Sequence, residues 1–288
     1  DRQLQVMELT KNHPSVKGWV TLVGHDLMSD ELVQKASNLA KDHLTNLTFH
    51  LSPHVGEVSQ YLEKTGMRPI NYISQLGVLG SHVLIGHAVH INDSELETLI
   101  HSETAIASCP WAYLKLGQGV TKFGRHPEFL SKGGRLSLGC DTENAGDNKD
   151  LLLTARLFSG LMQEAKLELD KPASHYALEL ITIGGAEALG LKEEIGSIEI
   201  GKRADVVLID TSGPSWQPPA PDPVMQLIWG GNSSDIDSVV ARGKIIVENK
   251  KCNTLDELAL ASEAKDRQKT LLKSAGLEPS CYWPITTY

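Results

Sequence analysis

Residues Ile195–Asp210 read I-G-S-I-E-I-G-K-R-A-D-V-V-L-I-D, and this stretch is the most informative one in the chain. Apolar and β-branched residues flank a Gly-Lys pair, a composition typical of two short strands joined by a turn. Two helical patterns, Asp150–Lys166 and Ala173–Gly190, come before it, and a proline-rich loop, Ser212–Pro223, comes after it. We therefore expect a small strand-rich unit to follow a larger part of the chain.

Composition limits the class of protein. The 288 residues are 41% hydrophobic and 22% charged, which is typical of a soluble globular protein of one or two domains. A formal net charge of −9, without a basic stripe, argues against nucleic-acid and membrane partners. The four cysteines show no CxxC spacing, so we expect reduced thiols. No signal peptide and no apolar span of eighteen residues is present, and the expected location is the cytoplasm.

Strand-like and helix-like segments alternate through the first half of the chain, which favours a parallel α/β architecture. Ser29 and Asn92 or Asp93 are expected to begin helices, since their side chains cap helix N-termini. After the proline-rich loop we expect two more strands and a terminal helix. The expected strands of the first half are Gly18–Gly24, Leu47–Leu51, His82–Val89, Thr104–Ser108 and Arg135–Cys140; the later elements are strands at Met225–Trp229 and Ser238–Val247 and a helix at Asp256–Ala275.

Three polar residues stand at or just after the ends of these strands. They are His50 in L-T-F-H-L-S, His87 in I-G-H-A-V-H-I, and Asp141 in L-S-L-G-C-D-T-E-N. Together with the segment at 195–210, these motifs resemble the amidohydrolase superfamily over nearly the whole chain. The most similar group is that of the aminohydrolases and chlorohydrolases, which includes adenosine-type, guanine and cytosine deaminases and s-triazine hydrolases.

The resemblance implies an α/β fold: a (β/α)8-type metallo-dependent hydrolase barrel followed by half of a small β-sandwich. Active sites in such barrels are built from the carboxyl ends of the strands. We therefore expect His50, His87 and Asp141 to converge on one cavity.

The resemblance makes His50 the metal-binding histidine of the fifth barrel strand. The segment K-T-G-M-R-P, Lys64–Pro69, follows His50 at the distance at which the group carries a Y-G-x-R-P-like motif. His54 is the alternative ligand, because it begins an H-x-x-E motif with Glu57. Choosing His54 requires an alignment shift of four residues and loses the match of Glu57 to a glutamate of the group.

Pro53 is the main departure from the group. The group usually has a glutamate three residues after the metal-binding histidine, where it shuttles a proton to the substrate. Proline has no titratable group and no N–H, so it cannot supply this function. Either His54, Glu57 or Glu143 takes over the role, or the reaction does not need a shuttle.

His87 corresponds to the histidine of the group that polarises the atom under attack and stabilises the developing charge. His90, the second histidine of that segment, either contacts the substrate or forms a hydrogen bond with a loop carbonyl. Asp141 corresponds to the aspartate that ligates the metal and accepts a proton from the attacking water. Glu143 replaces a small residue of the group, so the pocket shape should differ. Trp111 either lines the substrate pocket or packs at the barrel mouth.

No H-x-H motif, which provides two further metal ligands in the group, occurs in the chain. About five barrel strands are expected where the architecture has eight. The chain is therefore interpreted as the C-terminal part of a longer protein, with barrel strands four to eight at residues 1–190, sandwich strands at 191–250 and a helical tail at 251–288.

The implied chemistry is the metal-dependent hydrolysis of a carbon–nitrogen bond, with deamination of a nitrogen heterocycle as the first choice. Zinc is the expected metal, with Fe²⁺ or Mn²⁺ as alternatives, since histidine and carboxylate ligands suit all three. The alternative functions are hydrolysis of an amide, lactam or halide, and a degenerate homologue that binds a ligand without catalysis. A small-molecule substrate and a homo-oligomer are expected.

Overall fold

The structure is a computed structural model, and it describes residues 2–24, 28–278 and 283. The chain divides into two compact units, 1–203 with 211–235, and 204–210 with 236–288. The chain thus passes from the first unit to the second, returns, and crosses again. The expected three-part division at residues 190 and 250 stays a prediction.

The first unit contains a five-stranded parallel sheet in the order β1-β2-β3-β4-β5. Among the described residues, β1 and β5 each have one strand neighbour. All five strands fall within the predicted segments, so the parallel α/β architecture is confirmed. The strands are β1 (Val20–Gly24), β2 (Leu47–Leu51), β3 (Val83–His87), β4 (Ala105–Ser108) and β5 (Leu136–Leu138).

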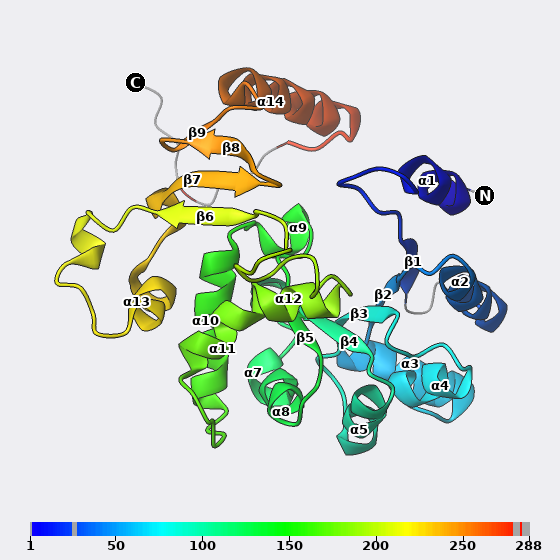
Figure 1. The fold of residues 1–288 in the computed structure, drawn as a ribbon. Coiled ribbons are helices and arrows are strands. Elements are labelled where there is room, and N and C mark those ends of the chain that lie inside the picture. Colours follow the sequence, from blue (N-terminus) through cyan, green and yellow to red (C-terminus); the bar gives the residue numbers. More distant parts are fainter. Residues whose placement is uncertain (1, 25–27, 279–282, 284–288) are drawn as a thin grey trace. The chain divides into compact units, whose positions relative to one another are not determined.

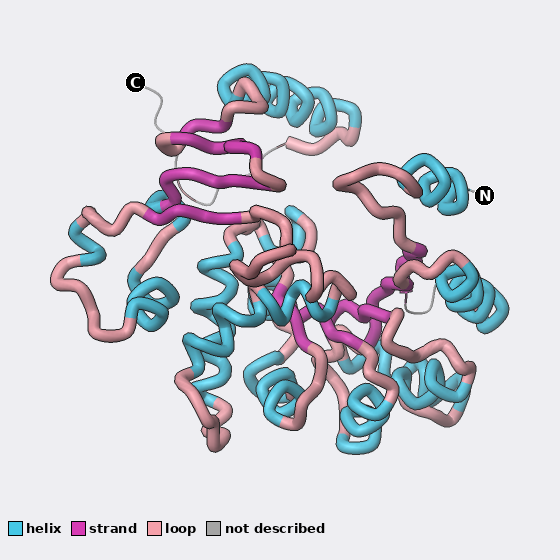
Figure 2. The backbone as a smooth tube through the Cα atoms, viewed as in Figure 1, coloured by secondary structure: helices cyan, strands magenta, loops and turns pink. Residues whose placement is uncertain are grey.

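Helices connect the strands and cover the sheet (Figures 1 and 2). Ser29 caps α2 by accepting a hydrogen bond from the N–H of Leu32, and Asn92 caps α5 in a reciprocal capping box with Glu95, as the sequence predicted. The helices of this unit are α1 (Arg2–Thr10), α2 (Asp30–Asp42), α3 (Val55–Thr65), α4 (Pro69–Gln75), α5 (Asp93–His101), α6 (Pro110–Lys115), α7 (Val120–Phe123), α8 (His126–Ser131), α9 (Glu143–Gly146), α10 (Leu151–Glu164), α11 (Ala173–Leu180), α12 (Ile183–Ala188) and α13 (Pro223–Gly230).

The main core lies between one face of the sheet and these helices. Side chains alternate across a strand, so Leu47, Phe49 and Leu51 of β2 point into this core while Thr48 and His50 face the other way. The core also takes apolar residues from α2, α4, α5, α8 and α10. His50 therefore lies on the face of the sheet opposite the main core.

Two predicted elements of this unit differ from the structure. Met225–Trp229 is not a strand but part of α13, because Asp222 accepts hydrogen bonds from the N–H groups of Val224 and Met225 and Pro223 occupies the first turn. The single helix expected over Ala173–Gly190 is interrupted at Thr182, which has φ −127° and ψ −105° and separates α11 from α12.

The second unit contains an antiparallel sheet in the order β6-β7-β8-β9. The prediction of two strands within Ile195–Asp210 was half wrong: only β6 forms, and residues 195–200 lie in turns and irregular backbone, where Gly196 has φ +95°. The predicted strand region at Ser238–Val247 forms the hairpin of β7 and β8, and the terminal helix is confirmed. The elements are β6 (Val206–Ile209), β7 (Ile236–Ala241), β8 (Lys244–Glu248), β9 (Lys251–Cys252) and α14 (Glu257–Ser274).

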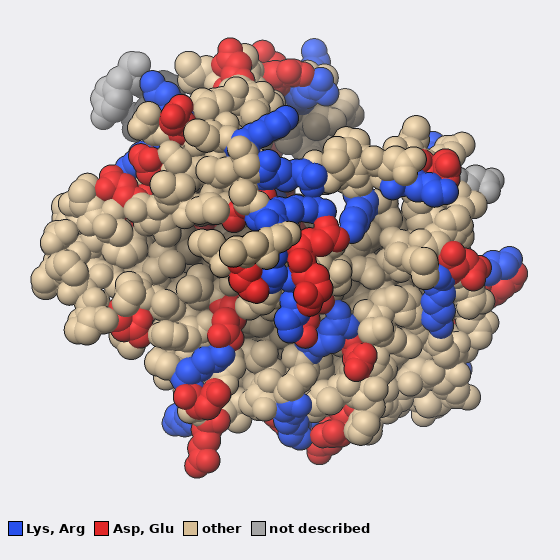
Figure 3. Space-filling view, in the orientation of Figure 1, with Lys and Arg blue, Asp and Glu red and all other residues tan. Residues whose placement is uncertain are grey.

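Charged side chains of both signs are interspersed on the face drawn in Figure 3. The chain also contains exposed ion pairs, such as Lys35 with Glu31. Within the part of the chain that the structure describes, none of the helices combines the length and the apolarity needed to cross a membrane.

A buried ion pair joins α4 to α5. The Nε of Arg68 donates to Glu95 Oε2 over 2.6 Å, and the Glu95 side chain is fully buried. Replacing Arg68 by methionine leaves this carboxylate buried without its cation, so we expect the free energy of unfolding to fall by about 3–5 kcal/mol. Lys35→Met is the control, because loss of an exposed pair costs under about 1 kcal/mol. Urea denaturation measures both, and equal losses would contradict the prediction.

Candidate functional site

The carboxyl ends of the parallel strands bring the predicted residues to one edge of the sheet. In the strand register His50 pairs with Gly86 and Leu51 pairs with His87, and Ser108 pairs with Leu138 two strands further on. Asp141 comes three residues after the end of β5 at Leu138. These residues come from different strands, and the parallel alignment places their strand ends side by side.

His50 lies against His87. Their ring centroids are 4.8 Å apart and the rings are nearly perpendicular, at 79°. Glycines stand beside His50 on both neighbouring strands, and only the one on β1 is needed for the close approach. A Cβ on Gly24, whose φ is +100°, would lie 2.2 Å from the carbonyl oxygen of His50, and a Cβ on Gly86 would lie 3.5 Å from its Cδ2. Gly24 is thus required for β1 to approach the backbone of His50.

His87 ends β3 with a left-handed backbone. Its φ is +82° and that of Ala88 is +50°, a conformation that costs energy for residues other than glycine. The side chain is 5% exposed, and its ring lies edge-on to Tyr113 at 5.6 Å. The N–H of Ala88 donates to Leu51 O over 3.0 Å, so the β2–β3 ladder continues past the strand end.

Asp141, which also has a left-handed backbone (φ +61°), lies close to His87. One ligand atom from each of His87, Cys109 and Asp141 lies within 4.8 Å of the others, a spacing that a metal ion can bridge. Asp141 Oδ1 accepts a hydrogen bond from the N–H of Thr142 over 2.7 Å. The predicted convergence of His87 and Asp141 is therefore seen in the geometry, and their chemical roles stay predictions.

Cys109 is a member of this group that the sequence analysis did not select. Burial and, to a smaller extent, the nearby Asp141 carboxylate raise the pKa of its thiol to about 12. The backbone N–H of Asp141, which hydrogen-bonds the sulfur, opposes this effect. In the absence of a metal ion the thiol is therefore protonated at neutral pH; a bound ion would displace this proton, so the sulfur counts among the donor atoms at this edge.

A second buried histidine, His126, lies behind His87 and was also missed. Its Nε2 is 2.5 Å from the carbonyl oxygen of His87, and its ring stacks on Tyr113 with 5.6 Å between centroids. Burial lowers its pKa to about 4, although the hydrogen bond to His87 acts in the opposite direction. His126 is therefore neutral at pH 7, and because a carbonyl only accepts, Nε2 carries the proton.

His90 and Trp111 lie nearby but contact protein groups. His90 Nε2 is 2.8 Å from the carbonyl oxygen of Gln118, and its ring packs on Phe123. Trp111 lies in the first turn of α6, and its buried Nε1 has no hydrogen-bond partner among the described residues. The His90 contacts match the structural reading left open for this residue, and both readings of Trp111 stay predictions, as do substrate contacts by either residue.

The two alternatives to His50 begin and support α3. His54 is its N-cap residue, and its Nδ1 accepts from the N–H of Glu57. Glu57 is 1% exposed, and its Oε1 accepts from the N–H of Ser52, two residues after His50. Pro53 is buried in the same turn. The Glu57 carboxylate therefore lies at the end of β2, whereas Glu143 is an exposed side chain paired with Lys149.

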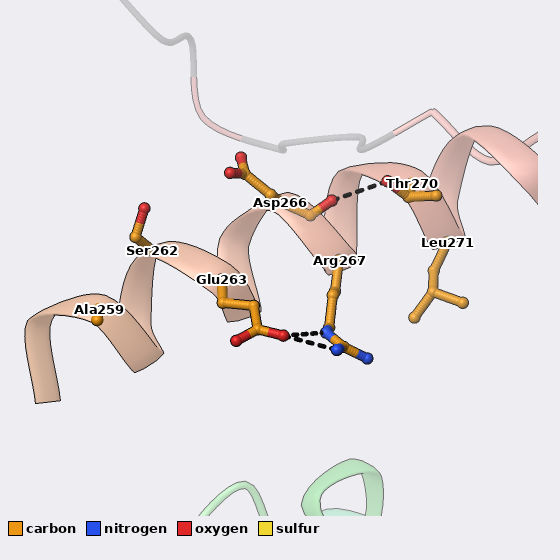
Figure 4. A pocket seen from close by; sticks show the side chains of 7 residues that line it. All are labelled: Ala259, Ser262, Glu263, Asp266, Arg267, Thr270 and Leu271. Atoms are coloured by element: carbon orange, nitrogen blue, oxygen red, sulfur yellow. Dashed lines mark hydrogen bonds and ion pairs between the residues drawn. The ribbon is translucent and has the colours of Figure 1, made fainter. Parts of the chain in front are cut away.

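A groove in the second unit involves none of these residues. It measures about 850 Å³ along α14, where Glu263 pairs with Arg267 and the hydroxyl of Thr270 donates to the carbonyl of Asp266 (Figure 4). Its polar groups satisfy one another along a single helix. The strand ends of the first unit therefore stay the candidate site.

Comparison with known proteins agrees with this geometry. The profile of the Amidohydrolase family matches residues 8–246. The chain belongs to the amidohydrolase family. A 5'-deoxyadenosine deaminase of Methanobrevibacter smithii is 32% identical over 237 residues, which are 82% of this chain and 54% of that protein. A 5-methylthioadenosine/S-adenosylhomocysteine deaminase of Moorella thermoacetica is 31% identical over 237 residues, with the same shares.

Solved structures share the fold of this amidohydrolase chain. An adenosine deaminase of Xanthomonas campestris with bound zinc has a TM-score of 0.90 at 22% identity, covering 94% of this chain and 61% of that one. An atrazine chlorohydrolase of Arthrobacter aurescens with zinc has a TM-score of 0.81 at 23% identity, covering 92% and 59%. The chain spans about half the length of the curated relatives it matches.

The residues present suit the metal that this family implies. Imidazole nitrogens and a carboxylate are the usual protein ligands of zinc outside thiolate sites. His87 and Asp141 supply such donors within reach of one ion, together with the sulfur of Cys109, and His50 lies against the ring of His87. The donor set therefore fits a divalent metal ion.

Proposed function

We propose that the protein containing this chain is a metal-dependent aminohydrolase that removes the exocyclic amino group of a nitrogen heterocycle. The observation that carries the proposal is the cluster of His87 and Asp141, with His50 packed against His87, at the carboxyl edge of a parallel sheet. The named relatives at 32% and 31% identity are deaminases of adenosine derivatives, which favours a purine nucleoside as the substrate class.

His50 and Asp141 would hold the metal, with zinc as the first choice and iron or manganese as alternatives. When bound, a divalent ion acts as a Lewis acid and lowers the pKa of a water molecule to about 7. Asp141 accepts the proton of the attacking water at its carboxylate. His87 donates a hydrogen bond to the charge that develops as the water oxygen bonds to the ring carbon. Cleavage of the carbon–nitrogen bond then requires a proton for the departing amine.

Glu57 is the acid that we assign to this last step. Among the described residues two carboxylates are buried, Glu57 and Glu95, and Glu95 is engaged by Arg68. Glu57 lies at the end of β2, in the turn in which Pro53 replaces the usual glutamate. It would protonate the amine, so that the carbon–nitrogen bond breaks and ammonia leaves. The proton of the added hydroxyl would pass to the ring nitrogen as the carbonyl forms, and the proton taken up by Asp141 would restore the acid form of Glu57.

Glu57→Gln is expected to lower kcat about 10²-fold, since general acid catalysis is lost. The fold should be kept, because the glutamine oxygen still accepts from the N–H of Ser52. Steady-state kinetics of the full-length protein on a purine nucleoside measure the effect. Pro53→Glu is the companion variant and should give no gain. Unchanged turnover in Glu57→Gln together with a gain in Pro53→Glu would contradict the assignment.

A further proposal concerns the fold of the whole protein. We propose that β1 to β5 correspond to barrel strands four to eight and that the antiparallel sheet is half of a sandwich completed by other residues.

The cytoplasmic location and the homo-oligomeric state stay predictions. Size-exclusion chromatography with light scattering of the full-length protein tests the latter, and a monomer would contradict it.

The proposed activity is tested with a panel of substrates. Full-length protein loaded with zinc is incubated with 5'-deoxyadenosine, methylthioadenosine, S-adenosylhomocysteine, guanine, an amide and a chlorotriazine, and ammonia release is measured. We expect ammonia from at least one purine substrate, with loss of turnover after chelation. Turnover of the amide or chlorotriazine alone would overturn the deaminase proposal.

A further inference from the structure

The carbonyl oxygen of His87 is held from behind by a buried side chain. His126 is 2% exposed, and its Nε2–H donates to this oxygen over 2.5 Å. The hydroxyl of Tyr113 lies 3.5 Å from the same oxygen, too far for a strong hydrogen bond. His126 is therefore the main donor to the His87 carbonyl.

Tyr113 keeps the His126 ring in place. The two rings stack with an angle of 10° between them, and the Tyr113 hydroxyl is fixed because it accepts from the N–H of Cys109 over 2.8 Å. The end of β4 is thereby tied to the same aromatic pair that supports the end of β3. We call the contact of His126, backed by Tyr113, with the His87 carbonyl the carbonyl clamp.

The backbone that carries His126 is also anchored. His126 is the first residue of α8, and its N-cap Arg125 donates to both carboxylate oxygens of Glu128, over 2.8 Å and 2.7 Å. Arg125 also pairs with Asp93 at the start of α5, over 2.7 Å. A short helix would otherwise fray at its first residue, so this arginine fixes the position from which His126 donates.

We propose that His126 is a positioning residue that sets the orientation of His87. A hydrogen bond to the carbonyl fixes the peptide plane between His87 and Ala88, and with it the direction in which the chain leaves His87 and the left-handed φ of Ala88, +50°. The imidazole leaves from the same Cα, so its position against His50 at 4.8 Å depends on that plane. The kinetic part of this inference rests on the proposed function.

The N–H of His126 matters as well as the packing of its ring on Tyr113. Without it the carbonyl oxygen loses its hydrogen bond from His126, and the peptide plane is less restrained against rotation toward the right-handed conformations that histidine prefers. Such a rotation moves the imidazole without unfolding the sheet, because the helix-facing core does not include His126. A displacement of about 1 Å at a catalytic group costs about 10²-fold in rate.

Two variants separate the donor from the packing. His126→Phe keeps an aromatic ring to stack on Tyr113 but has no N–H, whereas His126→Gln keeps an N–H near the position of Nε2. In the full-length protein we expect kcat to fall about 10²-fold in His126→Phe with little change in KM. His126→Gln should recover most of the loss. Equal losses in both variants would overturn the clamp, as would a His126→Phe variant with wild-type kcat.

A readout independent of turnover uses NMR of protein labelled with ¹⁵N at histidine. The wild type should show a slowly exchanging imidazole N–H from His126, and the His87 ring resonances should shift in His126→Phe but not in His126→Gln. His82→Phe, at the opposite end of β3, is the control and should leave the His87 resonances in place. The absence of a protected N–H from His126 in the wild type would overturn the inference, even if His126→Phe fails to fold.

The two proposals fail in different ways. If the wild type releases no ammonia from any heterocyclic amine, the proposed function is wrong, and the NMR signals still decide whether the clamp exists. If the wild type is active and the protected N–H is missing, the function stands and the clamp is wrong.

Discussion

Replacing Asp141 by asparagine in the full-length protein is expected to lower kcat about 10⁴-fold. In the proposed mechanism the variant removes both the base that accepts the proton of the attacking water and an anionic ligand for the metal. The backbone should not change, because the asparagine oxygen still accepts from the N–H of Thr142 and asparagine tolerates the left-handed φ of +61°. Stopped assays with long incubation measure the residual rate, and zinc content measured by mass spectrometry should fall with it.

Asp147→Asn is the matched control for this variant. Asp147 lies six residues further on, also has a left-handed backbone (φ +52°), and pairs with the exposed Lys115. The same chemical change at this position should leave both kcat and zinc content near the wild-type values. Comparable losses in Asp141→Asn and Asp147→Asn would show that the loop, and not the Asp141 carboxylate, determines activity.

Replacing His87 by phenylalanine is expected to lower kcat about 10³-fold with little change in KM. Loss of one preorganised donor to the developing charge costs this much in comparable hydrolases. An equal fall in kcat and kcat/KM indicates an interaction made only in the transition state. Phenylalanine preserves an aromatic ring between His50 and Tyr113, so the packing of the site should survive.

His87→Asn tests whether backbone strain, and not the loss of the imidazole, lowers kcat in the phenylalanine variant. Asparagine accepts the left-handed conformation more readily than phenylalanine, so a strain effect would disappear in this variant. We expect kcat to stay low in both variants, because neither carries the imidazole. Recovery of wild-type kcat in His87→Asn would show that the backbone conformation was the cause and would remove His87 from the chemistry.

The sequence predicted the parallel strands because their signals are local. Apolar runs mark β2 and β3, and Ser29 and Asn92 cap helices through their own side chains. The strand predicted at Met225–Trp229 is wrong because a short apolar run is also compatible with a helix. Asp222 and Pro223 form a helix start signal, and this signal favours the helix.

The candidate site also combines residues with local sequence signals and residues that folding alone brings together. Strand-end positions identified His50, His87 and Asp141, since parallel strands align their carboxyl ends. Cys109 and His126 approach His87 only through tertiary packing, and neither the periodicity nor the motifs around them signal that contact. The turn at Ile195–Ile200 shows the opposite failure, because its alternating apolar residues look like a strand although glycines at 196 and 201, both with positive φ, bend the chain.

The central claim is that His50 and Asp141 hold one metal ion beside His87. The most direct test is a crystal structure of the full-length protein with zinc, located by its anomalous scattering. We predict a single strong peak about 2.0–2.2 Å from a His50 nitrogen and an Asp141 carboxylate oxygen. A peak bound instead by His54, or the absence of any peak at the carboxyl ends of β2 and β5 in active protein, would contradict the account.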